Sequence, residues 1–177
     1  MAHAVELFLD PAAEARLRAL WAALDAAGAP VLDRYGSPGY RPHVSLGVVD
    51  AADPARLAPR LRAAAARAAG LTVRLATLGF FLERGRTIAF LGVAPSEPLL
   101  RLHREVDAAL QAAASGRRPF YRPGAWTPHC TLPVDAADPA AVAAVVRQFG
   151  LLVDARVAGV DLVEVGAAAA APLRAEP

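Results

Sequence analysis

Apolar and polar residues alternate in several short segments of the chain, and this alternation is typical of half-buried strands. The first such segment is Ala4 to Leu9, where Val5, Leu7 and Leu9 share one side. Further segments that predict strands run from Leu71 to Leu82, from Thr87 to Val93, from Leu151 to Val157 and from Val160 to Val165. Successive side chains of a strand point to opposite faces of its sheet, so each segment predicts one apolar and one more polar face.

Helical spacing of apolar residues separates these strands, and each helix has a recognisable start. An Asp or Ser followed closely by Pro combines an N-cap with a favoured first-turn residue. This pattern predicts helices that begin near Asp10-Pro11, Asp53-Pro54, Ser96 and Asp138-Pro139, with Gly28, Gly70 and Gly150 as stops.

The element order occurs twice. Asp50-Ala51-Ala52-Asp53-Pro54 returns letter for letter at residues 135–139, each time between a strand and a helix. An internal repeat on this scale predicts two similar lobes related by a pseudo-twofold axis. We therefore expect one bilobal domain over residues 1–177. Its fold class would be α+β, with an antiparallel sheet in each lobe, helices on the outer face and a groove between the lobes.

Composition narrows the class of protein. The chain has 177 residues, of which 55% are hydrophobic and 20% charged, as in a folded globular protein. All 19 cationic side chains are arginine, and the net charge of +2 is too small for a surface that coats nucleic acid generally. The single cysteine allows no internal disulfide, and no segment has the pattern of a signal peptide or a membrane span. We expect a cytoplasmic monomer with no obligate protein partner and no membrane association.

One five-residue phrase appears twice, as Pro42-His43-Val44-Ser45-Leu46 and Pro128-His129-Cys130-Thr131-Leu132. The chain has only four histidines, so the phrase holds half of them. In a strand, His43 and Ser45 would share one face, and His129 and Thr131 would do the same. Each pair would place an imidazole and a hydroxyl roughly 7 Å apart, which suits two oxygens of one phosphate group.

These paired phrases resemble the two-histidine (2H) phosphoesterase superfamily, and in particular its bacterial 2′-5′ RNA ligase and cyclic phosphodiesterase branch. The resemblance covers nearly the whole chain, to about Val165. It implies metal-independent cleavage of a 2′,3′-cyclic phosphate, or the reverse joining that makes a 2′-5′ bond. It also implies that the catalytic pairs are His43 with Ser45 and His129 with Thr131, that no cofactor is needed, and that the substrate is an RNA end or a small cyclic-phosphate nucleotide.

The residues themselves favour the same chemistry. Hydrolysis of a cyclic phosphodiester needs one group to take a proton from water and another to give one to the leaving ribose oxygen, and histidine can do either near neutral pH. Hydroxyls of Ser45 and Thr131 would donate to the non-bridging oxygens. The sequence does not assign the acid and the base. Two alternatives stay open: 2′-5′ RNA ligation by the same residues, and a non-catalytic module that binds RNA or nucleotides.

The loops that precede the two phrases hold the next candidates. Arginine suits phosphate oxygens, and aromatic rings offer stacking surfaces for bases. We expect substrate contacts from Tyr121 and Arg122 above all. Other Arg and aromatic side chains of these loops are further candidates: Arg117, Arg118, Phe120 and Trp126 in the second, and Arg34, Tyr35, Tyr40 and Arg41 in the first.

Two other residues could suggest different chemistry. His103 lies on the apolar face of a predicted helix and is expected to be a structural histidine. Cys130 follows His129, but alternation turns it to the buried face, where a thiol is a poor nucleophile. Zinc requires three or four protein ligands, and the two phrases supply two histidines with no further ligand at a recognisable spacing.

Overall fold

The computed structural model describes residues 2–29, 40–83, 86–150 and 152–165. Two short strands, β3 (Ala51–Ala52) and β6 (Ala114–Ser115), pair with each other, and one 3₁₀ turn, η2 (Pro119–Tyr121), precedes the second His phrase. The ten remaining elements follow the order strand, helix, strand, helix, strand twice. The first set is β1 (His3–Leu9), α1 (Pro11–Ala26), β2 (His43–Val49), α2 (Pro54–Ala68) and β4 (Thr72–Glu83); the second is β5 (Arg86–Val93), α3 (Glu97–Ala113), β7 (His129–Asp135), α4 (Pro139–Phe149) and β8 (Val153–Glu164).

Six strands form one antiparallel sheet in the order β2-β1-β8-β4-β5-β7. The long strand β8 joins the two halves of the sheet. Its residues Val153 to Arg156 pair with β4, whereas Val157 to Glu164 pair with β1. The predicted α+β class is therefore confirmed, with the two lobes joined through a shared strand.

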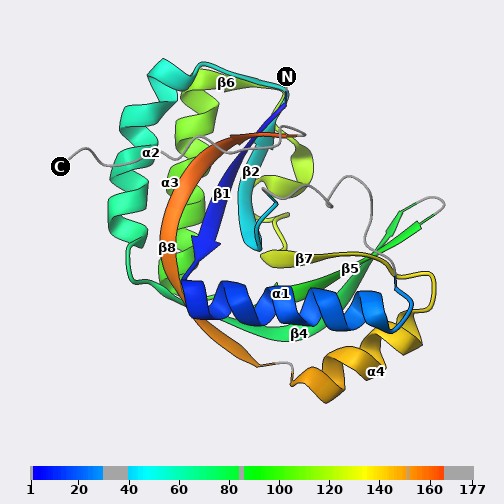
Figure 1. Ribbon diagram of the computed structural model, residues 1–177. Helices are drawn as coiled ribbons and strands as arrows, with labels where there is room; N and C mark the ends of the chain where they lie inside the picture. The colour runs from blue at the N-terminus through cyan, green and yellow to red at the C-terminus, as the bar shows by residue number, and fades with distance from the viewer. Residues whose placement is uncertain (1, 30–39, 84–85, 151, 166–177) are drawn as a thin grey trace.

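All four helices begin where the sequence predicts. The carboxylates of Asp10, Asp53 and Asp138 accept hydrogen bonds from the backbone N–H groups that open α1, α2 and α4, and Ser96 does the same for α3. The helices pack on one side of the sheet (Figure 1): α2 and α3 lie against each other over β8 and β2, and α1 and α4 lie against each other over the other half. Their leucine stripes form the buried core with the apolar side of the strands.

The end of the chain differs from the prediction. Two strands were expected around Val157 and Val160, but β8 runs through this point without a break. The register with β1 shifts here, because Leu9 is opposite Val157 and Phe8 is opposite Gly159. The extra residue is accommodated as a β-bulge, which bends a strand without ending it. A glycine between two apolar segments is compatible with either a break or a bulge, so the sequence alone does not distinguish the two.

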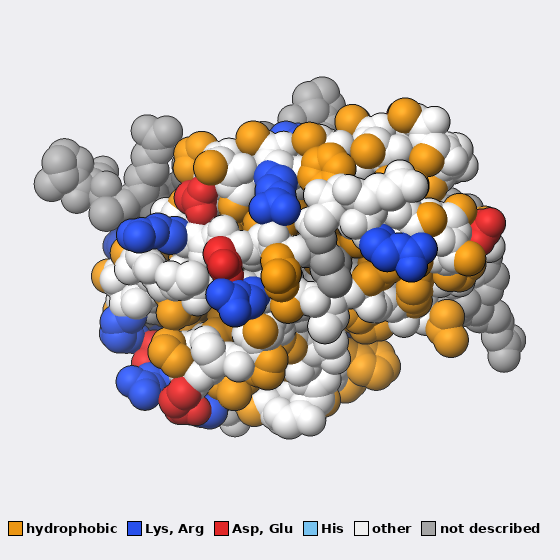
Figure 2. All heavy atoms as spheres, turned by 90° about the horizontal axis from the view of Figure 1, so that it is seen from below, with side chains coloured by type: hydrophobic (Ala, Val, Ile, Leu, Met, Phe, Trp, Pro, Cys, Tyr) orange, Lys and Arg blue, Asp and Glu red, His pale blue; other side chains and the backbone are white. Residues whose placement is uncertain are grey.

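The sheet is strongly curled. β2 and β7 occupy its two edges in the strand order, yet they contact each other, because the sheet folds back on itself around its face without helices (Figure 1). Seen from below the view of Figure 1, the side of the molecule where α1 and α4 lie carries isolated arginines and acidic side chains among apolar ones (Figure 2). Among the described residues, no histidine is visible on that side (Figure 2).

Candidate active site

The first His phrase lies on β2 as the alternation predicts. Val44 and Leu46 are fully buried beneath the helices, so His43 and Ser45 face the opposite, concave side of the sheet. Pairing with β1 places Phe8 opposite His43 and Glu6 opposite Ser45. Glu6 and Phe8 therefore share the concave face with the first pair.

The second His phrase has the same arrangement on β7. Cys130 and Leu132 are buried, and His129 and Thr131 point to the concave side. Burial raises the pKa of the Cys130 thiol to about 12, so this cysteine stays protonated at neutral pH. The expectation that Cys130 faces the core is confirmed.

Curling of the sheet brings the two phrases together. β2 and β7 are in contact, and His129 is near enough for its charge to act on the titration of His43. In the described part of the chain, no hydrogen bond uses the hydroxyl of Ser45 or Thr131. The structure therefore places all four predicted residues, two imidazoles and two hydroxyls, on one concave surface.

Both imidazoles are held in the same tautomer. Nδ1 of His43 donates to the carbonyl oxygen of Arg41 at 2.8 Å, and Nδ1 of His129 donates to the carbonyl oxygen of Thr127 at 2.7 Å. A carbonyl oxygen can only accept, so the proton of the neutral ring must be on Nδ1. In each histidine, Nε2 is left with a lone pair that can take a proton.

Burial is the main influence on both pKa values. It lowers the pKa of His43 to about 4, with a further lowering from the charge of His129, and it lowers the pKa of His129 as well. The free site at neutral pH therefore holds two uncharged imidazoles. A phosphate anion between them would favour a protonated ring, because an opposite charge nearby stabilises the charged form.

The two histidines have different surroundings. The ring of His129 contacts Phe81 and Phe90 edge-on, with ring centroids 4.8 and 5.3 Å away. The ring of His43 contacts Phe8 and Tyr40 edge-on, at 6.2 and 5.4 Å. His43 also has an acidic neighbour, since its Nε2 lies 3.3 Å from Oε1 of Glu6.

Glu6 is a site residue that the sequence motifs did not single out. A signal was present, because Glu6 is a charged residue within a strand whose other face holds Val5 and Leu7. Burial, with a smaller contribution from Asp161 on the neighbouring strand β8, raises the pKa of Glu6 to about 7. A carboxyl group with this pKa can carry a proton at physiological pH.

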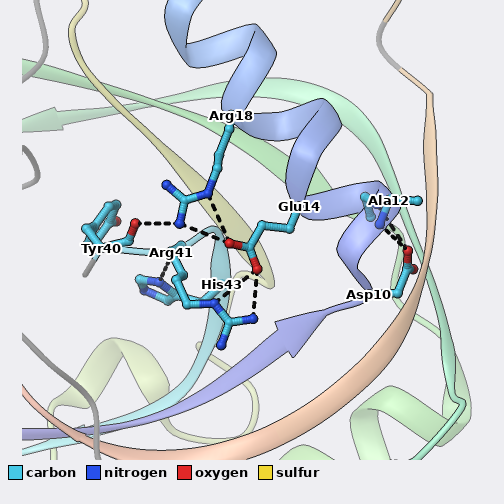
Figure 3. Close-up of polar contacts among 8 residues, drawn as sticks. Asp10, Ala12, Glu14, Arg18, Tyr40, Arg41 and His43 are labelled. Carbon is cyan, nitrogen blue, oxygen red and sulfur yellow. Dashed lines mark hydrogen bonds and ion pairs between the residues drawn. The ribbon is translucent and has the colours of Figure 1, made fainter. Parts of the chain in front are cut away.

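Tyr40 and Arg41 support His43 from the first loop (Figure 3). The Arg41 guanidinium binds the Glu14 carboxylate at 2.7 Å and lies over the Phe8 ring at 4.5 Å. The backbone carbonyl oxygen of Arg41 orients the His43 ring. Glu14 also binds Arg18, which donates to the Tyr40 carbonyl oxygen. The predicted residues Arg34 and Tyr35 lie outside the described residues.

The second loop is tied to β2 through Trp126. Its indole Nε1 donates to the Ser45 carbonyl oxygen at 3.0 Å, and its ring stacks on His103 with a centroid distance of 4.0 Å. His103 is buried and its Nε2 donates to the Tyr121 carbonyl oxygen at 2.8 Å, as expected of a structural histidine. These contacts hold the loop against the strand that carries the first pair.

The two arginines predicted in this loop are less closely engaged. Arg118 forms an exposed ion pair with Asp50, just after β2, at 2.8 Å. Arg122 is exposed, and its backbone closes the turn that leads to Trp126. Substrate contact by either side chain stays a prediction.

Metal-ligand clusters and membrane-spanning helices are both absent from the described residues. Among them, no three His, Cys, Asp or Glu side chains are grouped closely enough to hold a metal ion. Within the same residues, the helices are all too short or too polar to cross a membrane.

Comparison with known proteins bears on the whole arrangement. The chain resembles the MHV ns2 PDE domain, with 16% identity, a TM-score of 0.52, and coverage of 92% of this chain and 98% of that one. It also resembles Usb1 of Kluyveromyces marxianus, solved with uridine monophosphate, at 14% identity and a TM-score of 0.49, with 93% and 94% of the two chains covered. No curated protein matches the sequence significantly.

A family model gives the stronger result. Residues 48–167 match the model of the 2′-5′ RNA ligase superfamily, and this range includes the second His phrase. The match spans more than half of the chain and agrees with the 2H phosphoesterase fold that the sequence motifs indicated. The chain thus belongs to the 2′-5′ RNA ligase superfamily of two-histidine phosphoesterases.

Proposed function

We propose that this protein hydrolyses 2′,3′-cyclic phosphates at RNA ends or in small nucleotides, with His43 and His129 as its acid–base pair. The observation that carries the proposal is the matched tautomer of the two rings. Each Nδ1 is bound to a backbone carbonyl, which leaves each Nε2 on the concave face for proton transfer. Binding alone would not require two imidazoles oriented in the same way.

In the proposed reaction, water attacks phosphorus on the side opposite the leaving ribose oxygen. Nε2 of one histidine takes a proton from the water, and protonated Nε2 of the other gives a proton to the ribose oxygen as its bond to phosphorus breaks. The Ser45 and Thr131 hydroxyls donate to the two non-bridging oxygens, where negative charge accumulates. The product is a phosphate monoester, and the protons on the two histidines exchange with solvent before the next cycle.

The test is turnover of 2′,3′-cyclic mononucleotides in the presence of EDTA, with the products identified by chromatography. We expect H43A and H129A each to lose about 10²–10⁴-fold in kcat, the usual contribution of one acid–base group. His3→Ala is the matched control, because it removes a histidine at the far end of β1 from His43. Full activity of both site variants would refute the assignment.

The superfamily name makes ligation the natural second activity. Joining a 2′,3′-cyclic phosphate to a 5′-hydroxyl is the reverse of cleavage of a 2′-5′ bond, and it needs the same two proton transfers. An incubation with oligonucleotides carrying these ends shows whether ligated product forms beside the hydrolysed one. Binding of these ligands without any conversion would instead support the non-catalytic module.

A further inference from the structure

One polar group on the concave face has no part in the reaction described so far. The Glu6 carboxyl projects from β1 between the two strands that flank it, β2 and β8. Its side chain is only 13% exposed, and its Oε1 lies 3.3 Å from Nε2 of His43, the same nitrogen that the proposed reaction uses. His43 is similarly shielded, with 12% of its side chain exposed.

A structural role does not explain this position. A buried carboxyl group destabilises a protein unless it is paired or neutral, and a second acid, Asp161, faces it from β8. Arg41, two residues before His43 in the chain, has its guanidinium on the carboxylate of Glu14. Glu6 therefore lies against Nε2 of His43 at a cost to the stability of the fold. Such a cost is typical of residues that serve catalysis.

We propose that Glu6 is a positioning residue that keeps a proton beside Nε2 of His43, and so makes His43 the general acid and His129 the general base. This inference rests on the proposed function. Its basis is the asymmetry of the site: among the described residues, His43 has an acidic group at ion-pair distance, whereas His129 is bordered by the phenyl rings of Phe81 and Phe90.

One proton passes from Glu6 through His43 to the product in each cycle. In the free protein the Glu6–His43 pair holds this proton on the carboxyl group. When an anionic phosphate binds, the proton moves to Nε2 of His43, because an imidazolium between two anions is the favoured arrangement. His43 then gives it to the leaving ribose oxygen, and His129 takes one from the attacking water. Proton exchange with solvent returns a proton to Glu6 and removes one from His129.

The directions of the pKa shifts agree with this order. Glu6 has its pKa raised to about 7 and His43 has its pKa lowered to about 4, so the pair carries a single proton between these pH values. The other titratable groups around Glu6 do not compete for it. Asp161 raises the Glu6 pKa, the Cys130 thiol stays protonated, and His129 is neutral at pH 7 because burial lowers its pKa.

The pH profile of kcat/KM for a 2′,3′-cyclic mononucleotide tests the proposal. The active form carries the proton, so wild-type activity should fall as the pH rises through about 7. E6Q keeps the shape of the side chain but cannot hold the proton. We expect E6Q to lose on the order of 10²-fold at pH 6, the scale of one general-acid contribution, with its alkaline limb moved by more than one pH unit to the acid side. D161N should keep the maximal rate and move the limb modestly in the same direction.

A second measurement does not depend on turnover. In the NMR titration of the free wild-type protein, the Cε1–H resonance of His43 should show an inflection near pH 7 that E6Q lacks, with His129 as the internal reference. Two results would overturn the role of Glu6. One is an E6Q variant whose kcat/KM and alkaline limb of the pH profile match those of the wild type, and the other is a wild-type His43 signal without that inflection. Absence of wild-type hydrolysis would refute the proposed function, while the inflection would still decide whether the pair shares a proton. If E6Q does not fold, D161N and the wild-type titration decide.

Discussion

Replacement of Glu6 by Gln has a further consequence, which concerns stability. The unfolded chain binds the Glu6 proton with a pKa of 4.5, and the folded protein binds it with a pKa of about 7. Because the folded pKa is the higher one, Glu6 contributes stability that is fully present below pH 4.5 and is lost as the pH rises through 7. A difference of one pKa unit corresponds to about 1.4 kcal/mol, so the loss reaches about 3 kcal/mol above pH 7.

The assay is urea unfolding of wild type and E6Q at several values between pH 4.5 and 8.5. The amide side chain of the E6Q variant does not titrate, so the difference in unfolding free energy between the two proteins isolates Glu6 from the other titrating groups. As the pH rises from 4.5 to 8, we expect the unfolding free energy of E6Q to increase by about 3 kcal/mol relative to that of the wild type. For a chain of this size, this corresponds to a relative increase in Tm of roughly 6–12 °C.

Glu14→Gln is the matched control with the opposite sign. Burial opposes ionisation of Glu14, but the hydrogen bonds and charges of Arg41 and Arg18 outweigh it and lower its pKa. A lowered pKa contributes stability above the unfolded value, so E14Q should be less stable than wild type at pH 7 and approach it in acid. A constant offset between wild type and E6Q over the whole range would refute the reasoning about Glu6.

Three other predictions concern residues around the site. Cys130 should react with iodoacetamide at pH 8 only after unfolding, because it is 1% exposed and its pKa is raised to about 12; rapid labelling of the folded protein would contradict its placement. W126F should keep the ring stack and lose the hydrogen bond to the Ser45 carbonyl oxygen. We expect a loss of about 1 kcal/mol in the free energy of urea unfolding, together with a lower kcat. An unchanged kcat would show that this contact does not position Ser45. G79A places a methyl group against the ring of Phe90, so about 1–3 kcal/mol of destabilisation is expected. Activity should also fall, because this ring borders His129, the proposed general base; wild-type stability would show that the ring moves freely.

The sequence was sufficient for the parts of the fold that depend on local patterns. Alternation in the two His phrases correctly predicted which side of each strand is buried, since Val44 and Cys130 lie in the core. Asp-Pro pairs predicted the helix starts, because capping involves only residues two or three positions apart.

Other features depend on pairing between distant segments. The approach of Glu6 to His43 arises from the register of β1 and β2, and the contact of Trp126 with Ser45 arises from the path of a whole loop. Neither relation leaves a pattern within one segment. The sequence around Gly159 predicts a break, whereas pairing with the partner strand β1 keeps β8 continuous there and produces a bulge.

The way in which the two units share one sheet also bears on how the chain folds. Each repeat of the strand–helix–strand–helix–strand unit gives elements to both halves of the sheet: β1 and β2 lie in one half and β4 in the other, and α1 packs beside α4. Neither repeat encloses a hydrophobic core by itself. A chain cut between β4 and β5 would therefore leave the apolar faces of both pieces uncovered, and we expect neither piece to fold unless the other is present.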